Sequence, residues 1–447
     1  MRLAPRPAIR STHHRQRPAT SDEAANTPEH AVVRHPVVVY VVSRYPAISH
    51  SFVQREIAAL RDLGVTIHTV SLRVSRPEDV QSPADRVDYA DTLAVRPLSA
   101  RRLLGAHLHA LATQPYRYGA AAVSALRGRY GVRERVRRLG HFAQAAVVWQ
   151  HCTRLGVTHI HAHFERPAGD VARLAARLGR SDGVSWTWSF TAHSPQQYRT
   201  DALGLAKKVT EAAFVACVSY HGRRQLMDLV PENQWPKLHI VRCGVDTTVY
   251  RRITVRPSSV SPRVLTVARL VPGKGHAVLL DAMHQLQLWG LPLHAVWVGD
   301  GPEQERLQAR ANTLGLASFV TFLGPVGQDR MREVYEDADA FCLPSFSEGV
   351  PVSVMEAMAM ELPVVASDID GVPELVTHGI TGRLVLPGDP TALATALRET
   401  LGDTPAQRTA MGAAARQRVA RDFRCDRSAS ILLELLSATI TQHGAPR

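Results

Sequence analysis

Apolar residues recur along the chain at two spacings, which predict a regular succession of strands and helices. Residues 37–42 form a continuous apolar run dominated by valine, as expected of a strand buried on both faces of a parallel sheet. Residues 49–64 repeat apolar side chains every three or four positions and predict a helix, with Ser49 or Ser51 as its N-cap. Residues 65–72 return as a strand, which completes a βαβ unit.

The same succession predicts two doubly wound domains. In the first half, weaker repeats predict strands at 158–164, 185–192 and 214–219 and a helix at 168–178. A clearer alternation begins at Val264. Its predicted strands are 264–267, 294–298, 320–322, 338–343 and 364–366, and its predicted helices are 276–288, 303–314, 330–337 and 352–360. We therefore expect an α/β protein built from two doubly wound αβα domains.

Local composition predicts the domain boundaries. Residues 1–35 are rich in Arg, Pro, Ser and Thr and lack the apolar stretch of about 7 to 15 residues that marks a secretory signal, which predicts a disordered arm. Periodicity fails from 247 to 263, which predicts a linker. The expected parts are therefore an arm (1–35), an N-terminal domain (36–246), the linker (247–263), a C-terminal domain (264–425) and a final helix and tail (426–447).

Composition and charge limit the cellular location and the binding partners that we expect for the protein. The longest apolar runs are far shorter than the ~20 residues of a membrane span, and the five cysteines form no C-x-x-C pair, which favours a reducing cytoplasm. Lys and Arg number 53 against 40 Asp and Glu, a net charge of +13, so we expect anionic partners. Arginines concentrated at 127–138, with Arg101 and Arg102 upstream, predict either a solvated helix face or a patch for an anionic membrane surface.

Ligand sites in doubly wound sheets lie at the carboxyl ends of strands, so the loops after predicted strands carry the candidate chemistry. Arg269 and Lys274 lie in such a loop, which leads into a helix and could bind a diphosphate through charge and free backbone N–H groups. The alternative is that Arg269 and Lys274 are ordinary solvated cations of a surface loop. Gly299 and Gly301 follow the next strand, where they either let the backbone approach a ligand or form a structural turn.

Two further loops of the second half carry carboxylates. Glu348 lies in the loop after strand 338–343 and Glu356 in the helix that follows, so one can reach a bound sugar and the other vicinal ribose hydroxyls. A helix cap and a solvated helix residue are the alternative reading. The last loop, with Gly371 and Glu374, is expected to begin another helix beside the same strand ends.

Histidines are the candidate groups of the first half. His193 follows a predicted strand, and His159, His161 and His163 share one face of another because strand side chains alternate. Three histidines on one face raise the question of a metal, although no carboxylate or cysteine cluster accompanies them. A packed or hydrogen-bonded histidine strand is the alternative.

Taken in order, these loops resemble those of the family 4 glycosyltransferases, retaining enzymes of the GT-B fold that use nucleotide-sugar donors. Four motifs carry the resemblance: Arg269 with Lys274-Gly275, Gly299-Asp-Gly301, Glu348 with Glu356, and Gly371-Val-Pro-Glu374. The segment from Tyr45 to Phe52 is similar to the Phe-Pro-x-x-Ser-Glu-Thr-Phe start of exopolysaccharide and colanic-acid-type transferases. The resemblance implies two Rossmann-like domains facing a central cleft, the N-terminal one on the acceptor side and the C-terminal one binding the nucleotide sugar.

The resemblance also implies roles for particular residues. The catalytic set would be His193 beside the reacting sugar, Glu348 on the donor sugar, and Arg269 with Lys274 on the diphosphate. Glu356 would bind the ribose. The other donor-binding residues would be Gly299, Gly301, Gly349, Val350 and Gly371, and the acceptor-side residues would be Ser49, Ser51 and His163. The chain departs from the family at Gln196, where Asp is common, and at Asp370, where Gly is common.

The expected reaction moves a sugar from a nucleotide diphosphate sugar to a saccharide or a polyprenyl-diphosphate-linked acceptor, with retention and without a metal or other cofactor. Polysaccharide biosynthesis is the expected context, in the cytoplasm or on the cytoplasmic face of the membrane, with no nucleic acid as partner. Two alternatives stay open. One is a metal-dependent hydrolase built on His159, His161 and His163, and the other is a non-catalytic protein that binds sugar nucleotides.

Overall fold

The computed structural model describes residues 36–444 except 98, 129–130, 182, 194–201 and 254–260. The expected arm, part of the expected linker and Gln196 therefore lie outside the described residues. The domain boundaries drawn from the sequence stay predictions.

The first sheet contains seven parallel strands in the order β3-β2-β1-β4-β7-β8-β9. Strand order runs outward in both directions from the central pair β1 and β4, as in a doubly wound sheet. The strands are β1 (Val37–Arg44), β2 (Thr66–Arg73), β3 (Leu93–Ala94), β4 (His159–His163), β7 (Thr187–Ala192), β8 (Val215–Cys217) and β9 (Leu238–Ile240). A short antiparallel pair, β5 (Arg180–Ser181) and β6 (Val184–Ser185), lies outside this sheet.

Eight α-helices precede the second sheet within the described residues. They are α1 (Ser51–Asp62), α2 (Pro83–Asp91), α3 (Ala100–Thr113), α4 (Pro115–Leu126), α5 (Val132–Leu155), α6 (Ala168–Leu178), α7 (Ala202–Glu211) and α8 (Tyr220–Met227). The expected cap of α1 is wrong. A 3₁₀ turn, Ile48–His50, precedes the helix, so His50 occupies the N-cap position and makes no side-chain cap bond.

The second sheet contains six parallel strands in the order β12-β11-β10-β13-β14-β15, again wound outward from a central pair. Its strands are β10 (Arg263–Val267), β11 (His294–Val298), β12 (Val320–Gly324), β13 (Ala340–Leu343), β14 (Val364–Ser367) and β15 (Arg383–Val385). Its helices are α9 (His276–Leu288), α10 (Gln304–Thr313), α11 (Gln328–Glu336), α12 (Val352–Ala359), α13 (Pro390–Gly402) and α14 (Pro405–Asp422). The predicted fold class, α/β with two doubly wound sheets, is confirmed.

The prediction of a helix after Gly371 is wrong. Only one 3₁₀ turn forms, Val372–Glu374, and the chain then reverses through a tight turn before β15. The Glu374 carboxylate is engaged elsewhere, because it accepts hydrogen bonds from the backbone N–H groups of Tyr220 (3.0 Å) and His221 (2.8 Å) at the start of α8. This carboxylate therefore caps a helix of the first sheet.

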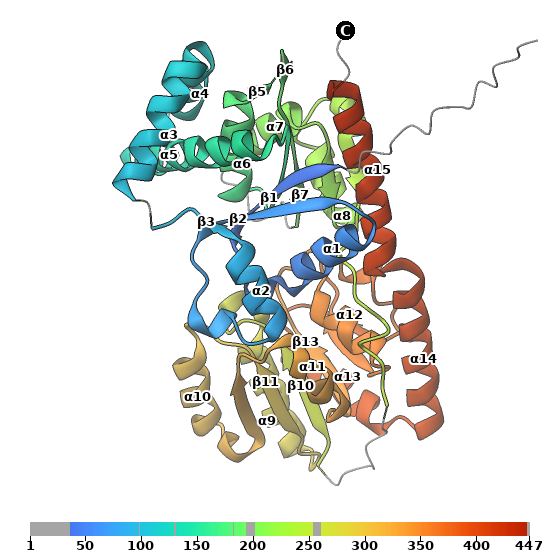
Figure 1. Cartoon of the computed structure of the whole chain (residues 1–447). Helices are drawn as coiled ribbons and strands as arrows, with labels where there is room; N and C mark the ends of the chain where they lie inside the picture. Colours follow the sequence, from blue (N-terminus) through green and yellow to red (C-terminus); the bar gives the residue numbers. More distant parts are fainter. Residues whose placement is uncertain are drawn as a thin grey trace, which may run out of the picture. The chain divides into compact units, whose positions relative to one another are not determined.

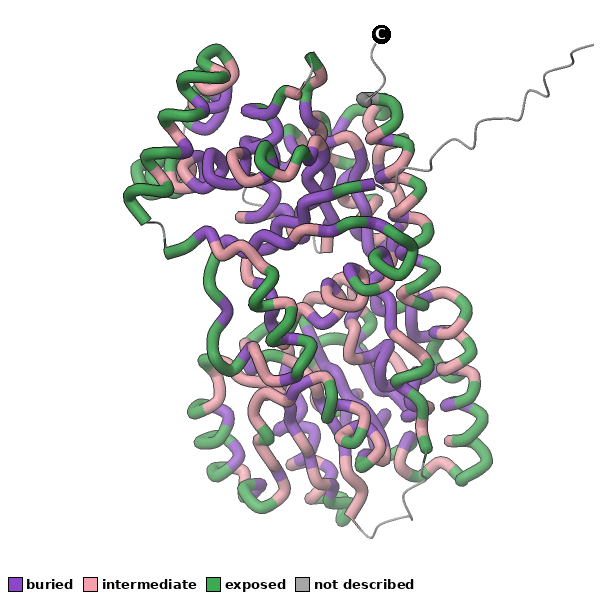
Figure 2. Tube along the Cα trace, in the orientation of Figure 1, coloured by how far each residue is buried: buried purple, intermediate pink, exposed green. Residues whose placement is uncertain are grey.

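The C-terminal end of the chain packs against both sheets. Helix α14 contributes Val419 to the apolar cluster of the second sheet, whereas α15 (Cys425–Gly444) contributes Leu432 and Leu436 to the cluster that buries one face of β1. Figure 1 shows α15 running alongside α1, and Figure 2 shows buried residues following the strands of both sheets. The last helix is thus part of the core of the first sheet.

The substitution Leu432→Ala tests this packing. Leu432 has no exposed surface, so removal of its side chain should leave a cavity and lower the free energy of unfolding by about 2 to 4 kcal/mol. The exposed neighbour Glu434 provides the control, and Glu434→Ala should change stability by less than about 0.5 kcal/mol. Equal denaturation midpoints for the two variants would show that α15 does not contribute to the core.

Candidate active site

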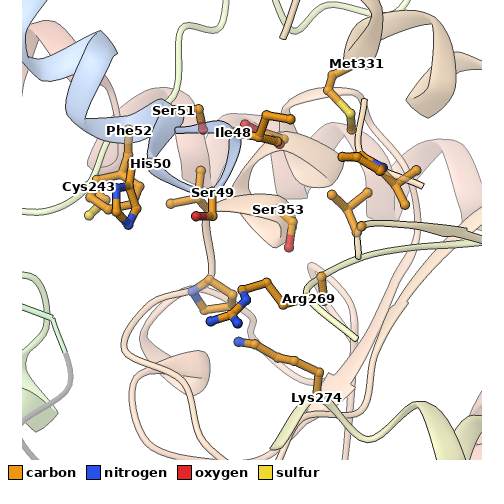
Figure 3. Close-up of a pocket in the computed structure, with 18 of the residues that line it drawn as sticks. Ile48, Ser49, His50, Ser51, Phe52, Cys243, Arg269, Lys274, Met331 and Ser353 are labelled. Carbon is orange, nitrogen blue, oxygen red and sulfur yellow. The ribbon is translucent and has the colours of Figure 1, made fainter. Parts of the chain in front are cut away.

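A cavity of about 450 Å³ lies where both sheets reverse their strand order. Loops that follow β1 and β4 line it from the first sheet, and loops that follow β10 and β13 line it from the second. This is the place where doubly wound sheets bind ligands, and the volume lies in the usual range for small-molecule sites. Figure 3 shows Ser49, Ser51 and Phe52 in one part of the wall and Arg269 with Lys274 in another.

The loop after β10 brings two cations to the cavity. Arg269 is exposed there, and Lys274 ends a 3₁₀ turn just before α9. Gly275 has φ +71°, and a Cβ at this residue would lie 1.8 Å from the carbonyl oxygen of Pro344, so only glycine fits. This close contact fixes the loop of the cations against the loop after β13.

Lys274 and Glu348 form an ion pair inside the cavity. The Lys274 Nζ donates to Glu348 Oε1 at 2.5 Å, and the Ser345 hydroxyl donates to the same oxygen at 2.7 Å. The backbone N–H of Glu348 donates to the Asp370 carboxylate at 3.0 Å. Asp370 adopts φ +45°, a conformation that glycine takes most easily and that Asp tolerates, so this departure from the family pattern adds an anchor for the Glu348 loop.

Glu356 lies in the wall of the cavity with both carboxylate oxygens engaged. Its Oε1 forms an ion pair with Arg55 of α1, and its Oε2 accepts the Tyr335 hydroxyl at 2.8 Å. Arg55 also donates to the Ser51 hydroxyl at 2.9 Å. Burial, followed by the charge of Glu356, raises the pKa of Tyr335, so its hydroxyl remains a donor. Sequence reasoning missed Arg55, and the spacing of four residues from Ser51 on one helix face was the only available signal.

The backbones of the two halves meet at Gly349. A Cβ at this residue would lie 2.2 Å from the carbonyl oxygen of His193, so a side chain there would collide with the end of β7. Gly299, Gly349 and Val350 line the cavity, whereas Gly301 and Gly371 are absent from its described lining, and the donor-binding roles of all five stay predictions. A Cβ at Gly371 would meet the carbonyl of Gly349, so this residue lies behind the wall.

His193 lies at the end of β7 and lines the cavity from the first sheet. Its ring packs against Phe52 and Phe164, with centroids 4.9 Å and 4.4 Å away. Burial, and after it the neighbouring His163 and His50, lower the pKa of His193 well below its usual range, so the ring is neutral at physiological pH. Burial likewise lowers the pKa of His50 to about 4.

His163 is absent from the described lining of the cavity and lies behind His193. Its Nδ1 is 3.4 Å from the Nε2 of His193, and its Nε2 is 2.9 Å from Glu56 Oε1. Sequence reasoning missed Glu56 as well. His163, expected on the acceptor side, contacts His193, and its acceptor-side role stays a prediction.

The histidine strand is hydrogen-bonded along its length. Both ring nitrogens of His159 and of His161 lie 2.7–2.9 Å from hydroxyl oxygens of the adjacent strand β7, which are those of Thr187, Ser189 and Thr191. Among the described residues, the atoms of Glu56, His161 and His163 come within 4.8 Å of one another, but their ring nitrogens already have partners. This arrangement favours the hydrogen-bonded strand over a metal site made by His159, His161 and His163.

The sequence and fold match those of known transferases. A family model described as "Glycosyl transferases group 1" matches residues 254–418. A protein named as a colanic acid biosynthesis glycosyltransferase, WcaL of Salmonella typhimurium, is 28% identical over 405 residues, which cover 86% of this chain and 96% of WcaL. The amylovoran biosynthesis glycosyltransferase AmsK of Erwinia amylovora is 34% identical over 168 residues, which cover 36% of this chain and 41% of AmsK.

A solved structure agrees with the fold. Anabaena HepE in complex with UDP-glucose superposes with a TM-score of 0.67 at 19% identity, covering 90% of this chain and all of HepE. The matched family model covers the second sheet with its cation loop, Glu348 and Glu356, and the similarity to WcaL extends over nearly the whole chain. Residues 254–418 therefore match the group 1 glycosyltransferases (the retaining family GT4), and the chain is a nucleotide-sugar glycosyltransferase with the GT-B fold.

Proposed function

We propose that this glycosyltransferase moves a hexose from a nucleoside diphosphate sugar to a saccharide or lipid-linked acceptor during exopolysaccharide assembly. One observation carries the proposal: a single cavity is lined by Arg269, Lys274 and Glu356 from the second half and by His193 from the first. Relatives named for colanic acid and amylovoran biosynthesis support the exopolysaccharide context.

The donor occupies the second half of the cavity in this proposal. Arg269 and Lys274 bind the diphosphate and stabilise the negative charge that develops as the nucleoside diphosphate leaves. Glu356 binds the ribose, because each carboxylate oxygen can accept more than one hydrogen bond and the contacts to Arg55 and Tyr335 leave capacity for hydroxyls. When the diphosphate binds the Lys274 ammonium group, Glu348 loses its ion pair with Lys274 and contacts the donor sugar.

Retention requires no separate protein base. The acceptor hydroxyl attacks from the face that the diphosphate leaves, and the leaving phosphate takes the acceptor proton. The lowered pKa of His193 makes it a weak base, so its role is to position the sugar and to stabilise the transition state. Ser49 is exposed and available to an acceptor, whereas the Ser51 hydroxyl already accepts from Arg55.

We propose that the reaction needs no metal ion. Arg269 and Lys274 supply two positive charges beside the expected diphosphate position, which is the task that a divalent cation performs in metal-dependent transferases. Donor turnover in the presence of a chelator should therefore equal turnover in its absence.

The surface of α3, α4 and α5 supports a membrane-bound acceptor. Each helix exposes apolar side chains at intervals of three, four or seven residues: Leu104, Leu108 and Leu111 on α3, Tyr116, Val123 and Leu126 on α4, and Val132, Val136 and Leu139 on α5. Exposed arginines accompany them, including Arg101, Arg127 and Arg133. No helix of the described residues is long and apolar enough to cross a bilayer. We propose that this surface binds the anionic cytoplasmic face of a membrane.

The donor site is tested by Arg269→Ala. This change removes a charge-assisted hydrogen bond, so UDP or GDP binding should weaken by about 1.5 to 3 kcal/mol, roughly 10- to 150-fold. A thermal-shift screen with UDP-glucose and GDP-mannose identifies the nucleotide first, because a ligand that binds only the folded protein raises its melting temperature.

Arg306→Ala is the matched control for this charge change. Arg306 is exposed on α10 and pairs with Glu303, and it is absent from the lining of the cavity. Its removal should leave nucleotide affinity unchanged. Wild-type affinity in Arg269→Ala would remove Arg269 from the donor site.

The membrane surface is tested by the double substitution Leu108→Glu with Val136→Glu. Co-sedimentation of the wild-type protein with phosphatidylserine vesicles should decrease as salt rises, because salt screens surface attraction. The double variant should bind about tenfold less even at low salt, since it replaces apolar contact with like charge. Ile380→Glu changes an exposed apolar residue of the second half and should bind as the wild type does. Full binding by the double variant would place the contact elsewhere.

The stereochemistry is tested with an α-linked nucleotide sugar. Same-face attack should give an α-linked product, which NMR identifies by the anomeric coupling of the first-formed product. A β-linked first product would contradict the mechanism and would require a base on the opposite face.

A further inference from the structure

Behind the cavity, hydrogen bonds connect Glu56, His163 and His193. We propose that Glu56 and His163 are positioning residues, which hold the His193 ring in one neutral tautomer with the proton on Nε2. This inference rests on the proposed role of His193 beside the donor sugar, and it adds two residues that do not touch the substrate themselves.

The direction of the hydrogen bonds begins at Glu56. Its Oε1 lies 2.9 Å from the Tyr40 hydroxyl and 2.9 Å from Nε2 of His163. Burial, and after it the charge of Glu56, raise the pKa of Tyr40, so the phenol stays protonated and donates. A carboxylate only accepts, so His163 must carry its proton on Nε2 and expose a lone pair on Nδ1.

The same direction continues through His193. The lone pair on His163 Nδ1 faces His193 Nε2 at 3.4 Å, so the His193 proton is on Nε2. The other nitrogen, Nδ1, lies 3.8 Å from the Sγ of Cys243. Burial raises the pKa of Cys243, so the group remains a thiol that can donate its proton to Nδ1. Every donor along the chain from Cys243 to Glu56 therefore has an acceptor.

This arrangement has two consequences for the cavity. The ring is fixed by hydrogen bonds at both nitrogens and by packing against the tilted rings of Phe52 and Phe164. The Glu56 carboxylate also places negative charge behind the ring, which favours the positive charge that develops on a sugar as its leaving group departs. A half-buried acid on α1 thus acts on the reaction through two imidazole rings.

The test compares two substitutions at Glu56. Glu56→Leu removes the acceptor, so His163 and His193 lose their fixed tautomers. Glu56→Gln keeps an oxygen that can accept from both Tyr40 and His163 and removes only the charge. Ser189→Ala is the control, because Ser189 is a buried hydrogen-bonding residue that binds His159 and His161 on the same strand pair rather than His193.

Two measurements are made on the full chain. Two-bond ¹H–¹⁵N correlations of ¹⁵N-histidine protein report the ring tautomers, with the His193 signals assigned by comparison with His193→Asn. Steady-state turnover is measured with whichever of UDP-glucose and GDP-mannose stabilises the protein. Glu56→Leu should lose the Nε2–H form of His193 and lower kcat about 10- to 100-fold, the range known for groups that orient metal-bound histidines, with KM for the donor changed less than about threefold. Glu56→Gln and Ser189→Ala should keep the tautomer, and Glu56→Gln should recover most of kcat.

An unchanged His193 tautomer in Glu56→Leu would overturn the proposal, and so would a changed tautomer with wild-type kcat. Failure of the proposed function leaves the wild-type protein without donor turnover, and failure of the role proposed for His193 gives another result. In that case His193→Asn itself keeps full turnover, although the spectra still show whether Glu56 sets the tautomer.

Discussion

The cost of burying a charge determines how the cavity is built. An ionised carboxylate removed from water is costly unless a cation or hydrogen-bond donors lie beside it. Glu356 meets this requirement with Arg55 and Tyr335, and Glu348 meets it with Lys274 and Ser345. Because Arg55 comes from α1 and Glu356 from α12, the requirement also joins the two halves of the molecule.

The same requirement explains which parts of the site could be predicted from sequence. Arg269, Lys274 and Glu348 follow buried strands in glycine- or proline-containing loops, and such loops at the carboxyl end of a parallel sheet are recognisable locally. Arg55 and Glu56 are single polar residues on a helix with an ordinary apolar face. The partner of Arg55 is 301 residues away in sequence, and that of Glu56 is 107 residues away, so no local pattern indicates either contact.

Some elements of the fold could likewise be predicted from sequence, and others could not. Five of the six strands of the second sheet were predictable because they are short, largely apolar runs separated by helices, whereas the three-residue strand β15 was not predicted. The helices between 83 and 155 were not predicted, because they follow one another without intervening long strands and α5 changes from an arginine-rich start to a buried apolar middle. The three histidines of β4 were placed correctly on one face. Their partners depend on which strand lies beside β4, and strand order is a property of the whole sheet.

The return of α15 to the first sheet has a consequence for synthesis of the chain on the ribosome. The face of β1 that includes Val38 and Tyr40 is buried partly by Leu432 and Leu436, which are translated roughly 400 residues later. Until the ribosome has released those residues, the first sheet carries an uncovered apolar face while the second half is still being made. The nascent chain is therefore a candidate for chaperone binding throughout its elongation, and its N-terminal half reaches its final form only after termination.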